Sequence, residues 1–240
     1  MNLNCKIIIT GGSGRFGSIL QKKYRSNKLL YPSKKQLNIL SVRSIEGYIK
    51  KNKPKILIHL AGLSRPMKTH EKNISKSIDL NIIGTANIVK VCSKFNIKLI
   101  YFSTNYVYPG KKGNYKETDS ILPINNYGWS KLGGESSVHL YKNSLILRVC
   151  MTEKPFIHEE AFIDFKTNFI FQEELAMILF KIISLKGILN LGGRSQSVYN
   201  FAKKFSSNIK PISRNSVKSF KNYPNISMNI EKLKSIINSQ

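Results

Sequence analysis

Short apolar runs alternate with helical patterns through the first 150 residues, and this alternation restricts the fold more than any other feature. The apolar runs, rich in Ile, Leu and Val, cover residues 6–10, 28–31, 55–61, 98–103 and 144–148. Helical patterns between them cover residues 15–25, 42–51, 74–95 and 126–141. Continuous apolar runs are typical of strands buried on both faces, and strands that alternate with helices indicate a parallel sheet. The chain therefore predicts an α/β fold, a Rossmann-type doubly wound parallel sheet.

The pattern changes after residue 150. Helical patterns cover residues 171–186 and 197–206, and a strand that ends in a glycine turn is expected between them at 187–193. We expect a loop over residues 207–228, because this segment is rich in Ser, Asn and Pro. Residues 229–238 predict a last helix with Asn229 as its N-cap. We therefore divide the chain into a main domain, 1–150, and a small lobe, 151–240, that is interleaved with the main domain.

Composition favours a cytoplasmic globular protein. The chain has 240 residues, 41% of them hydrophobic, which is enough to bury a core. It has neither the apolar run that a membrane helix needs nor the features of a signal peptide at its N-terminus. Cys5, Cys92 and Cys150 lie far apart, and we expect small buried thiols in a reducing compartment. The spacing of the histidines predicts no metal site. We expect the single tryptophan, Trp129, to be a packing residue.

The formal net charge of +26 raises the question of nucleic-acid binding. The lysines are scattered, and Lys, Asn and Ile are all abundant, as expected from A/T-rich codons. We therefore interpret the charge as a solvated basic surface and predict no nucleic-acid or membrane partner. A positive field would still attract a ligand that carries a diphosphate.

A glycine-rich turn follows the first predicted strand. The segment KIIITGGSGRFGSIL contains a strand, then Gly11, Gly14 and Gly17, then an amphipathic helix. Glycine lets the backbone approach a pyrophosphate, and the helix N-terminus presents N–H groups and the positive end of its dipole. This context predicts a dinucleotide-binding loop, with a bare strand–helix turn as the alternative. After the second strand come Lys34 and Lys35, with no acid until Glu46, which favours NADP(H) over NAD(H).

Tyr127 and Lys131 lie four positions apart in a predicted helix, and therefore one turn apart on the same face. A phenol with a pKa of about 10 is a poor acid at neutral pH, but a neighbouring ammonium lowers that pKa. Such a pair can exchange a proton with a carbonyl or alcohol oxygen. The alternative is a coincidental pair on a helix surface. Thr104, at the end of the fourth strand, offers a hydroxyl for a substrate carbonyl, or simply a cap for the strand end.

Several segments, in their order and spacing, resemble the extended short-chain dehydrogenase/reductase superfamily: TGGSGRFG, HLAGLS, DLNIIGTANIV, FSTNYVYPG and YGWSKLGGE. Within it the chain is most similar to the dTDP-4-dehydrorhamnose reductase family, which reduces 4-keto-6-deoxy sugar nucleotides. The segments STNYVYPG, NYKETD and PINNYGWSKLGGE carry this closer resemblance. The similarity is strong from residue 7 to 148 and looser beyond.

The resemblance implies roles for individual residues. It makes Thr104, Tyr127 and Lys131 the catalytic triad. The residues implied to hold the cofactor, together with Lys34, are Gly11, Gly14, Arg15, Phe16, Gly17, Asn38, Ile39, Ala61, Gly62, Asn81, Tyr127 and Lys131. Those implied to contact the substrate are Ser64, Asn105, Tyr106 and Met151. Asn38 and Asn105 stand where the family commonly has Asp, and no Asp–Glu pair follows Thr104, which argues against a sugar-nucleotide dehydratase.

The implied activity is NAD(P)H-dependent reduction of the 4-keto group of a 4-keto-6-deoxy sugar nucleotide, with Tyr127 as proton donor. A sugar-nucleotide epimerase that retains its NAD is an alternative on the same fold. A non-catalytic dinucleotide-binding regulatory subunit is a third hypothesis, because the methionine adenosyltransferase regulatory subunit resembles this family. The expected partner is a small-molecule sugar nucleotide. Oligomeric state stays open, a homodimer included.

Overall fold

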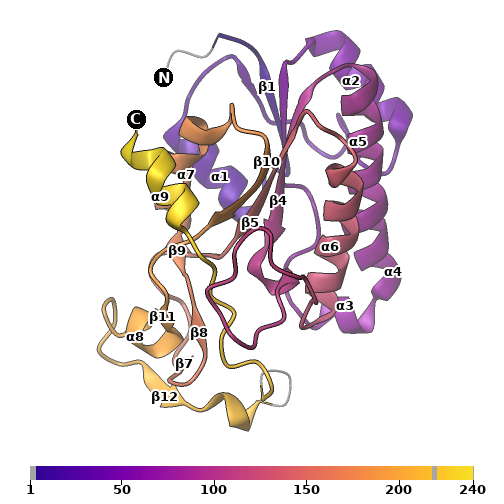
Figure 1. Ribbon diagram of the computed structural model, residues 1–240. Coiled ribbons are helices and arrows are strands. Elements are labelled where there is room, and N and C mark those ends of the chain that lie inside the picture. Colours follow the sequence, from indigo (N-terminus) through magenta and orange to yellow (C-terminus); the bar gives the residue numbers. More distant parts are fainter. Residues whose placement is uncertain (1–3, 218–220, 240) are drawn as a thin grey trace. The chain divides into compact units, whose positions relative to one another are not determined.

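The computed structural model describes residues 4–217 and 221–239, and it confirms the predicted α/β fold (Figure 1). A six-stranded sheet has the order β10-β5-β4-β3-β1-β2. Its strands are β1 (Ile7–Thr10), β2 (Leu29–Leu30), β3 (Ile56–His59), β4 (Lys98–Thr104), β5 (Ser144–Val149) and β10 (Gly187–Leu191). Neighbouring strands from β2 to β4 pair in parallel. Every residue of β1 and of β5 is buried, as predicted for strands that are covered on both faces.

The chain forms two compact units that interleave along the sequence. The first unit comprises Met1–Ser103, Ser130–Ile146 and Ile183–Gly187. The second comprises Thr104–Trp129, Leu147–Ile182 and Ile188–Gln240. The predicted division into 1–150 and an interleaved lobe of 151–240 stays a prediction.

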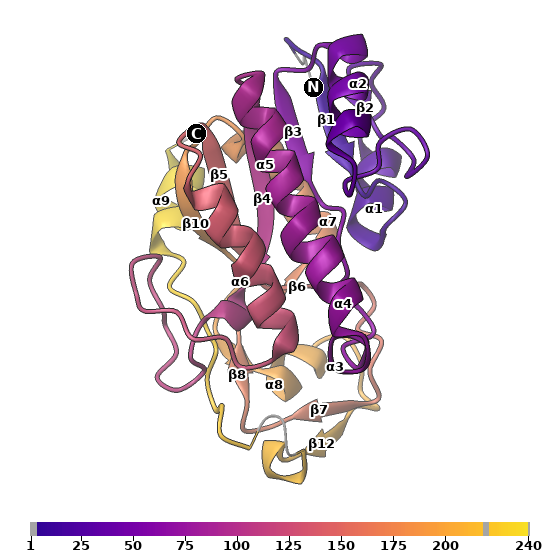
Figure 2. The ribbon, with the colours of Figure 1, turned by 90° about the vertical axis from the view of Figure 1, so that its right-hand side faces the viewer.

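Helices lie on both sides of the strands in the first unit. Its helices are α1 (Arg15–Lys23), α2 (Val42–Asn52), α3 (Thr69–Lys72), α4 (Ile74–Ser77) and α5 (Gly84–Lys94), with the π-helical segment η1 (Ile78–Ile83) between the last two. Figure 1 shows α1 and α5 on opposite sides of β1. Figure 2 shows α4, η1 and α5 as one continuous rod. The helix predicted over 74–95 therefore exists, but a π-helical segment interrupts it. The next helix, α6 (Asn126–His139), begins in the second unit and continues in the first.

The second unit consists of short strand pairs and helices. β6 (Met151–Thr152) pairs with β9 (Ile170–Phe171), β7 (Glu160–Phe162) with β12 (Lys210–Ile212), and β8 (Lys166–Thr167) with β11 (Gln196–Ser197). The remaining elements are η2 (Asn105–Val107), α7 (Gln172–Ile182), α8 (Val198–Ala202), η3 (Arg214–Ser216) and α9 (Glu231–Asn238). The prediction of loop throughout 207–228 was wrong for β12 and η3, because β12 is stabilised by its pairing with the distant β7. Positions 218–220 of that prediction lie outside the described residues.

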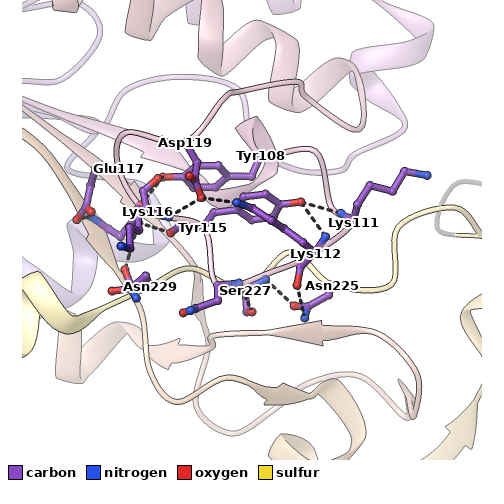
Figure 3. Close-up of polar contacts among 12 residues, drawn as sticks. Tyr108, Lys111, Lys112, Tyr115, Lys116, Glu117, Asp119, Asn225, Ser227 and Asn229 are labelled. Carbon is purple, nitrogen blue, oxygen red and sulfur yellow. Dashed lines mark hydrogen bonds and ion pairs between the residues drawn. The ribbon is translucent and has the colours of Figure 1, made fainter.

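A stacked tyrosine pair anchors the loop that follows η2 (Figure 3). The rings of Tyr108 and Tyr115 are 4.9 Å apart and nearly parallel. The hydroxyl of Tyr115 accepts the backbone amides of Lys111 and Lys112, and the Tyr115 amide donates to the carbonyl of Ser227. The segment before α9 is thereby fastened to this loop.

Arg148, in β5, has its hydrogen-bond partners inside the fold. Arg148 is buried, and its Nη1 donates to the Tyr108 hydroxyl at 2.8 Å and to the Glu117 carbonyl at 3.1 Å. These contacts hold the guanidinium inside the second unit.

Three smaller predictions have mixed outcomes. Trp129, the expected packing residue, is 51% exposed, so only about half of its surface packs against the rest of the chain. The N-cap of α9 is Ile230 and not Asn229, although the Asn229 side chain does accept the amide of Glu231. Cys92 and Cys150 are buried free thiols as predicted, and Cys5 is a half-buried one.

Candidate active site

The turn after β1 is made of glycines that leave no room for a side chain. Gly11 has a φ of +71°, in the left-handed region, and a Cβ there would lie 2.7 Å from the backbone nitrogen of Ala61. A Cβ on Gly17 would lie 2.5 Å from the carbonyl oxygen of Gly11. The strand order reverses between β1 and β3, and sheets of this kind bind ligands outside the strand ends at such a point.

The helix α1 starts directly after this turn. Gly14 is its N-cap, no side chain makes a cap hydrogen bond, and the first turn contains no acidic residue. Backbone N–H groups in this position favour an anion. The glycine cradle and the helix N-terminus therefore fit the pyrophosphate of the predicted dinucleotide. Nη2 of Arg15, at the start of α1, donates to Oγ of Ser64 at 3.2 Å, which brings a predicted cofactor residue and a predicted substrate residue together.

Other residues predicted to hold the cofactor lie near the same strand ends, in different environments. Phe16 is buried, and its ring centroid is 5.4 Å from that of Phe102, so this side chain belongs to the core. Ile39 is buried as well. The half-buried Asn38 accepts, through Oδ1, the backbone amide two residues later. Lys34 is exposed in the loop after β2, where a ligand phosphate can reach it.

Asn81 holds the backbone that follows β3. It lies in the π-helical segment η1 and is buried. Its Oδ1 accepts the amide of Leu63 at 2.7 Å, while its Nδ2 donates to the Leu63 carbonyl at 2.9 Å and to Oγ of Ser130 at 2.8 Å. A Cβ on Gly62 would lie 2.7 Å from Oδ1 of Asn81, so this contact also requires a glycine. Short π-helical segments frequently occur at functional sites.

A buried histidine connects the ends of β1 and β3 to α5. Thr85 uses its hydroxyl hydrogen on the Asn81 carbonyl, so its Oγ1 accepts a hydrogen bond from Nε2 of His59 at 3.2 Å. Nδ1 of His59 then accepts from Oγ1 of Thr10 at 2.8 Å, and Thr10 in turn accepts the amide of Ala61. Burial, and then the charge of Lys131, lower the pKa of His59 to about 3, so the imidazole is neutral. This chain of hydrogen bonds assigns one tautomer.

Lys131 is 9% exposed and is surrounded by polar and aromatic groups of the first unit. Its Nζ lies over the ring of Tyr101, 4.2 Å from the centroid, and the Tyr101 hydroxyl donates to the Lys131 carbonyl at 3.0 Å. Burial lowers the pKa of Lys131 to about 7, and the negative charge of Glu135 opposes this shift. The Glu135 carboxylate is itself buried and accepts a hydrogen bond from Ser103.

The second unit contains the remaining predicted residues. Oγ1 of Thr104 accepts the amide of Tyr106 and caps η2. Asn105 is buried, and its Nδ2 donates to Oγ1 of Thr167 at 3.1 Å, so this amide is used inside the unit. The rings of Tyr106 and Tyr127 meet edge to face, 6.1 Å apart. Met151 begins β6, opposite Ile170 of β9.

The helix α6 presents Tyr127 and Lys131 one turn apart, as their spacing predicted. Tyr127 is half-buried and Lys131 is buried. In general, an ammonium beside a phenol stabilises the phenolate and makes the phenol a better proton donor.

The family described as RmlD substrate binding domain matches residues 5–152. This chain belongs to that family.

Individual relatives of this RmlD-family chain fall into two groups. Methionine adenosyltransferase 2 subunit beta from Xenopus tropicalis is 30% identical over 154 residues, 60% of this chain and 46% of that protein. dTDP-4-dehydrorhamnose reductase from Aggregatibacter actinomycetemcomitans is 31% identical over 152 residues, 61% of this chain and 51% of that protein. The chain therefore spans about half the length of the curated relatives that it matches.

A solved structure is similar over almost the whole chain. It is dTDP-4-dehydrorhamnose reductase from Bacillus anthracis in complex with NADP, with a TM-score of 0.85 and 26% identity. The similarity covers 97% of this chain and 93% of that one. The fold of the RmlD-family chain is thus that of a Rossmann-type reductase.

Sequence reasoning missed Tyr101 and Glu135 as neighbours of Lys131, and it treated His59 only as a structural or solvated residue. The sequence contains a signal for Glu135 only, and the row formed by His59 and Tyr101 comes from the structure. Glu135 follows Lys131 by four positions, on the same helical face. Sheet register places His59 beside Tyr101, and Thr10 beside His59, so these side chains form one row across three strands.

Among residues 4–217 and 221–239, no group of His, Cys, Asp or Glu has the arrangement of a metal site. Within the same ranges, no helix has the length and apolar character that crossing a membrane requires.

Proposed function

We propose that this chain is an NAD(P)H-dependent reductase that acts on the 4-keto group of a 4-keto-6-deoxy sugar nucleotide. Membership of the RmlD family and the similarity to the reductase from Bacillus anthracis support the proposal. One observation carries it. Lys131, whose side chain is buried, lies one helical turn from Tyr127 in α6.

A reduced nicotinamide, when bound, would supply the hydride that the carbonyl carbon needs. Tyr127 donates its phenolic proton to the carbonyl oxygen, so that the ketone becomes a secondary alcohol. Lys131 stabilises the phenolate that Tyr127 leaves behind. The Thr104 hydroxyl orients the substrate oxygen, and Ser64, Asn105, Tyr106 and Met151 contribute to substrate binding.

The glycine cradle and the N-terminus of α1 would hold the pyrophosphate of the cofactor. We expect a preference for NADPH, because Lys34 is exposed after β2 and the reductase from Bacillus anthracis was crystallised with NADP. The free thiols fit a reducing compartment, so the proposal includes a cytoplasmic location.

The decisive experiment is a turnover assay with a 4-keto-6-deoxy sugar nucleotide, in which NADPH consumption is followed by absorbance. Tyr127→Phe should lower kcat by about 100-fold or more, since a positioned general acid contributes that much. NADPH binding by the variant, measured by fluorescence titration, should weaken much less than kcat falls, because the glycine turn that would hold the pyrophosphate is unchanged. Full turnover by Tyr127→Phe would refute the assignment of the proton donor.

The similarity to methionine adenosyltransferase 2 subunit beta supports a second candidate function, a dinucleotide-binding regulatory subunit without catalysis of its own. It requires NADPH binding without turnover on any keto sugar nucleotide. Co-purification with a larger enzyme, whose activity changes when this chain is added, would favour it over the reductase.

A further inference from the structure

The carbonyl group of Gly12, in the turn between β1 and α1, is held by a side chain to which the proposed function gives no role. Nε2 of Gln21 donates to this carbonyl oxygen at 2.9 Å. Gln21 lies in the second turn of α1, and the side chains of a helix lean toward its N-terminus. Gly17 precedes Gln21 by four positions on the same face. Because Gly17 has no side chain, it leaves room for the amide of Gln21 to reach the turn.

The surroundings of Gly12 leave its carbonyl oxygen little freedom. Gly12 is buried, and a Cβ there would lie 2.9 Å from Nε2 of Gln21 and 2.9 Å from both Cβ and Cδ1 of Tyr31. A Cβ on Gly17 would lie 2.7 Å from the Gly12 oxygen. The oxygen therefore lies against the side of α1, close to Gly17 and Gln21.

The orientation of this peptide group decides which of its two dipole ends an anion at the turn would meet. The bond between Gly12 and Ser13 is trans, so its C=O and N–H point in opposite directions. Because the oxygen is turned toward Gln21, the N–H of Ser13 points away from that side chain, and Ser13 is exposed. The carbonyl of Gly11 is engaged as well, by the amide of Gly14 at 2.9 Å. Both glycine carbonyls at the start of the turn thus have donors of their own.

We propose that Gln21 is a positioning residue of the phosphate-binding turn. Its amide keeps the Gly12 oxygen turned away from a bound pyrophosphate and leaves the Ser13 N–H directed toward it. Backbone N–H groups attract phosphate, whereas a carbonyl oxygen that faces the same phosphate repels it. Without the hydrogen bond the peptide can rotate, because glycine adopts backbone conformations that other residues avoid. Part of the free energy of binding is then lost in ordering the turn.

The inference rests on the proposed function in one respect, that this turn binds the pyrophosphate of a dinucleotide. It applies equally to the reductase and to the regulatory subunit, since both bind the dinucleotide. The test therefore measures binding and not turnover.

The experiment is fluorescence titration of the whole protein with NADPH, together with thermal unfolding of the ligand-free protein. Gln21→Met keeps the length of the side chain and removes the donor. The matched control, Asn52→Leu, removes a hydrogen bond of the same kind in α2, from Nδ2 of Asn52 to the Tyr48 carbonyl at 2.9 Å. A rescue variant combines Gln21→Lys with Lys22→Gln, which restores a donor at position 21 and keeps the net charge of α1.

We expect the Kd for NADPH to rise at least about fivefold in Gln21→Met, and to stay within about twofold of the native value in the control and in the rescue variant. Gln21→Met and Asn52→Leu should lower Tm by similar amounts, about 2–4 °C, because each loses one hydrogen bond. An unchanged Kd in Gln21→Met, an equal rise in Asn52→Leu, or a rescue variant that binds as weakly as Gln21→Met would each overturn the role of Gln21.

Failure of the proposed function gives a different result. A native chain that binds neither NADPH nor NADH would overturn the dinucleotide site, and the role of Gln21 with it. A native chain that binds NADPH but turns over no keto sugar nucleotide would overturn the reductase alone, and the Kd values of the variants would still decide the role of Gln21.

Discussion

Nζ of Lys131 lies over the ring of Tyr101, 4.2 Å from its centroid, while the hydroxyl of the same tyrosine donates to the Lys131 carbonyl. Tyr101 therefore contacts both the side-chain ammonium and the backbone carbonyl of Lys131. The ring faces the ammonium, and the hydroxyl holds the helix backbone from which the side chain extends. Because Tyr101 is fully buried in β4, the position of the ammonium is set by the sheet as well as by α6.

The first prediction separates the contribution of the Tyr101 ring to turnover and stability from the contribution of its hydroxyl. Tyr101→Phe should lower the free energy of unfolding by about 1 kcal/mol, the contribution of one hydrogen bond, and leave turnover nearly unchanged. Tyr101→Leu removes the face on which the ammonium rests and should lower both kcat and the free energy of unfolding, the latter by roughly 3 kcal/mol. Urea unfolding and the NADPH-consumption assay measure the two effects. An equal loss of kcat in both variants would assign the effect to the hydroxyl.

The second prediction concerns Glu135, whose charge raises the pKa of Lys131 against the effect of burial. Glu135→Gln should lower the pKa of Lys131 further. If turnover requires the ammonium, the alkaline limb of the pH–kcat profile moves to lower pH. Ser103→Ala is the matched control, since it removes the hydrogen bond to Glu135 but keeps the charge. An unchanged alkaline limb in Glu135→Gln would show that this carboxylate has no influence on the lysine.

The third prediction is a loss of stability in acid through His59. Its pKa of about 3 in the folded chain lies below the value of about 6.5 in an unfolded one. Between these values the unfolded state binds more protons, so the free energy of unfolding falls with falling pH, by about 1.4 kcal/mol per pH unit. His59→Gln lacks this dependence. The deficit in its free energy of unfolding relative to the native chain should therefore become smaller as the pH falls from 6.5 to 4. The exposed His139→Gln serves as control. A constant deficit across that range would contradict the prediction.

The fourth prediction uses two glycines in different surroundings. Gly17→Ala places a Cβ 2.5 Å from the Gly11 carbonyl and should abolish tight NADPH binding, because the loop has to open. Gly47→Ala meets no atom within 4 Å on the exposed side of α2 and should stabilise the chain by about 0.5–1 kcal/mol. Fluorescence titration with NADPH and thermal unfolding test both variants. Normal NADPH affinity in Gly17→Ala would exclude this turn as the phosphate loop.

Local signals in the sequence predicted most of the sheet and the helices around it. Each predicted strand of the first 150 residues is present, because a short continuous apolar run is typical of a strand that is buried on both faces of a parallel sheet. The π-helical segment around Asn81 was not predictable, since α- and π-helical turns have nearly the same apolar pattern. The strand β12 was not predictable either, because Lys210–Ile212 is extended through its pairing with β7.

The sequence by itself determined the alternating α/β pattern, the glycine turn and the one-turn spacing of Tyr127 and Lys131, because these depend on neighbours within a few residues. Only the tertiary structure showed that Lys131 rests on Tyr101 and that His59 forms a row with Thr10 and Tyr101. Those contacts join residues tens of positions apart. Which of them meet depends on strand register and helix packing, and no short stretch of sequence contains that information.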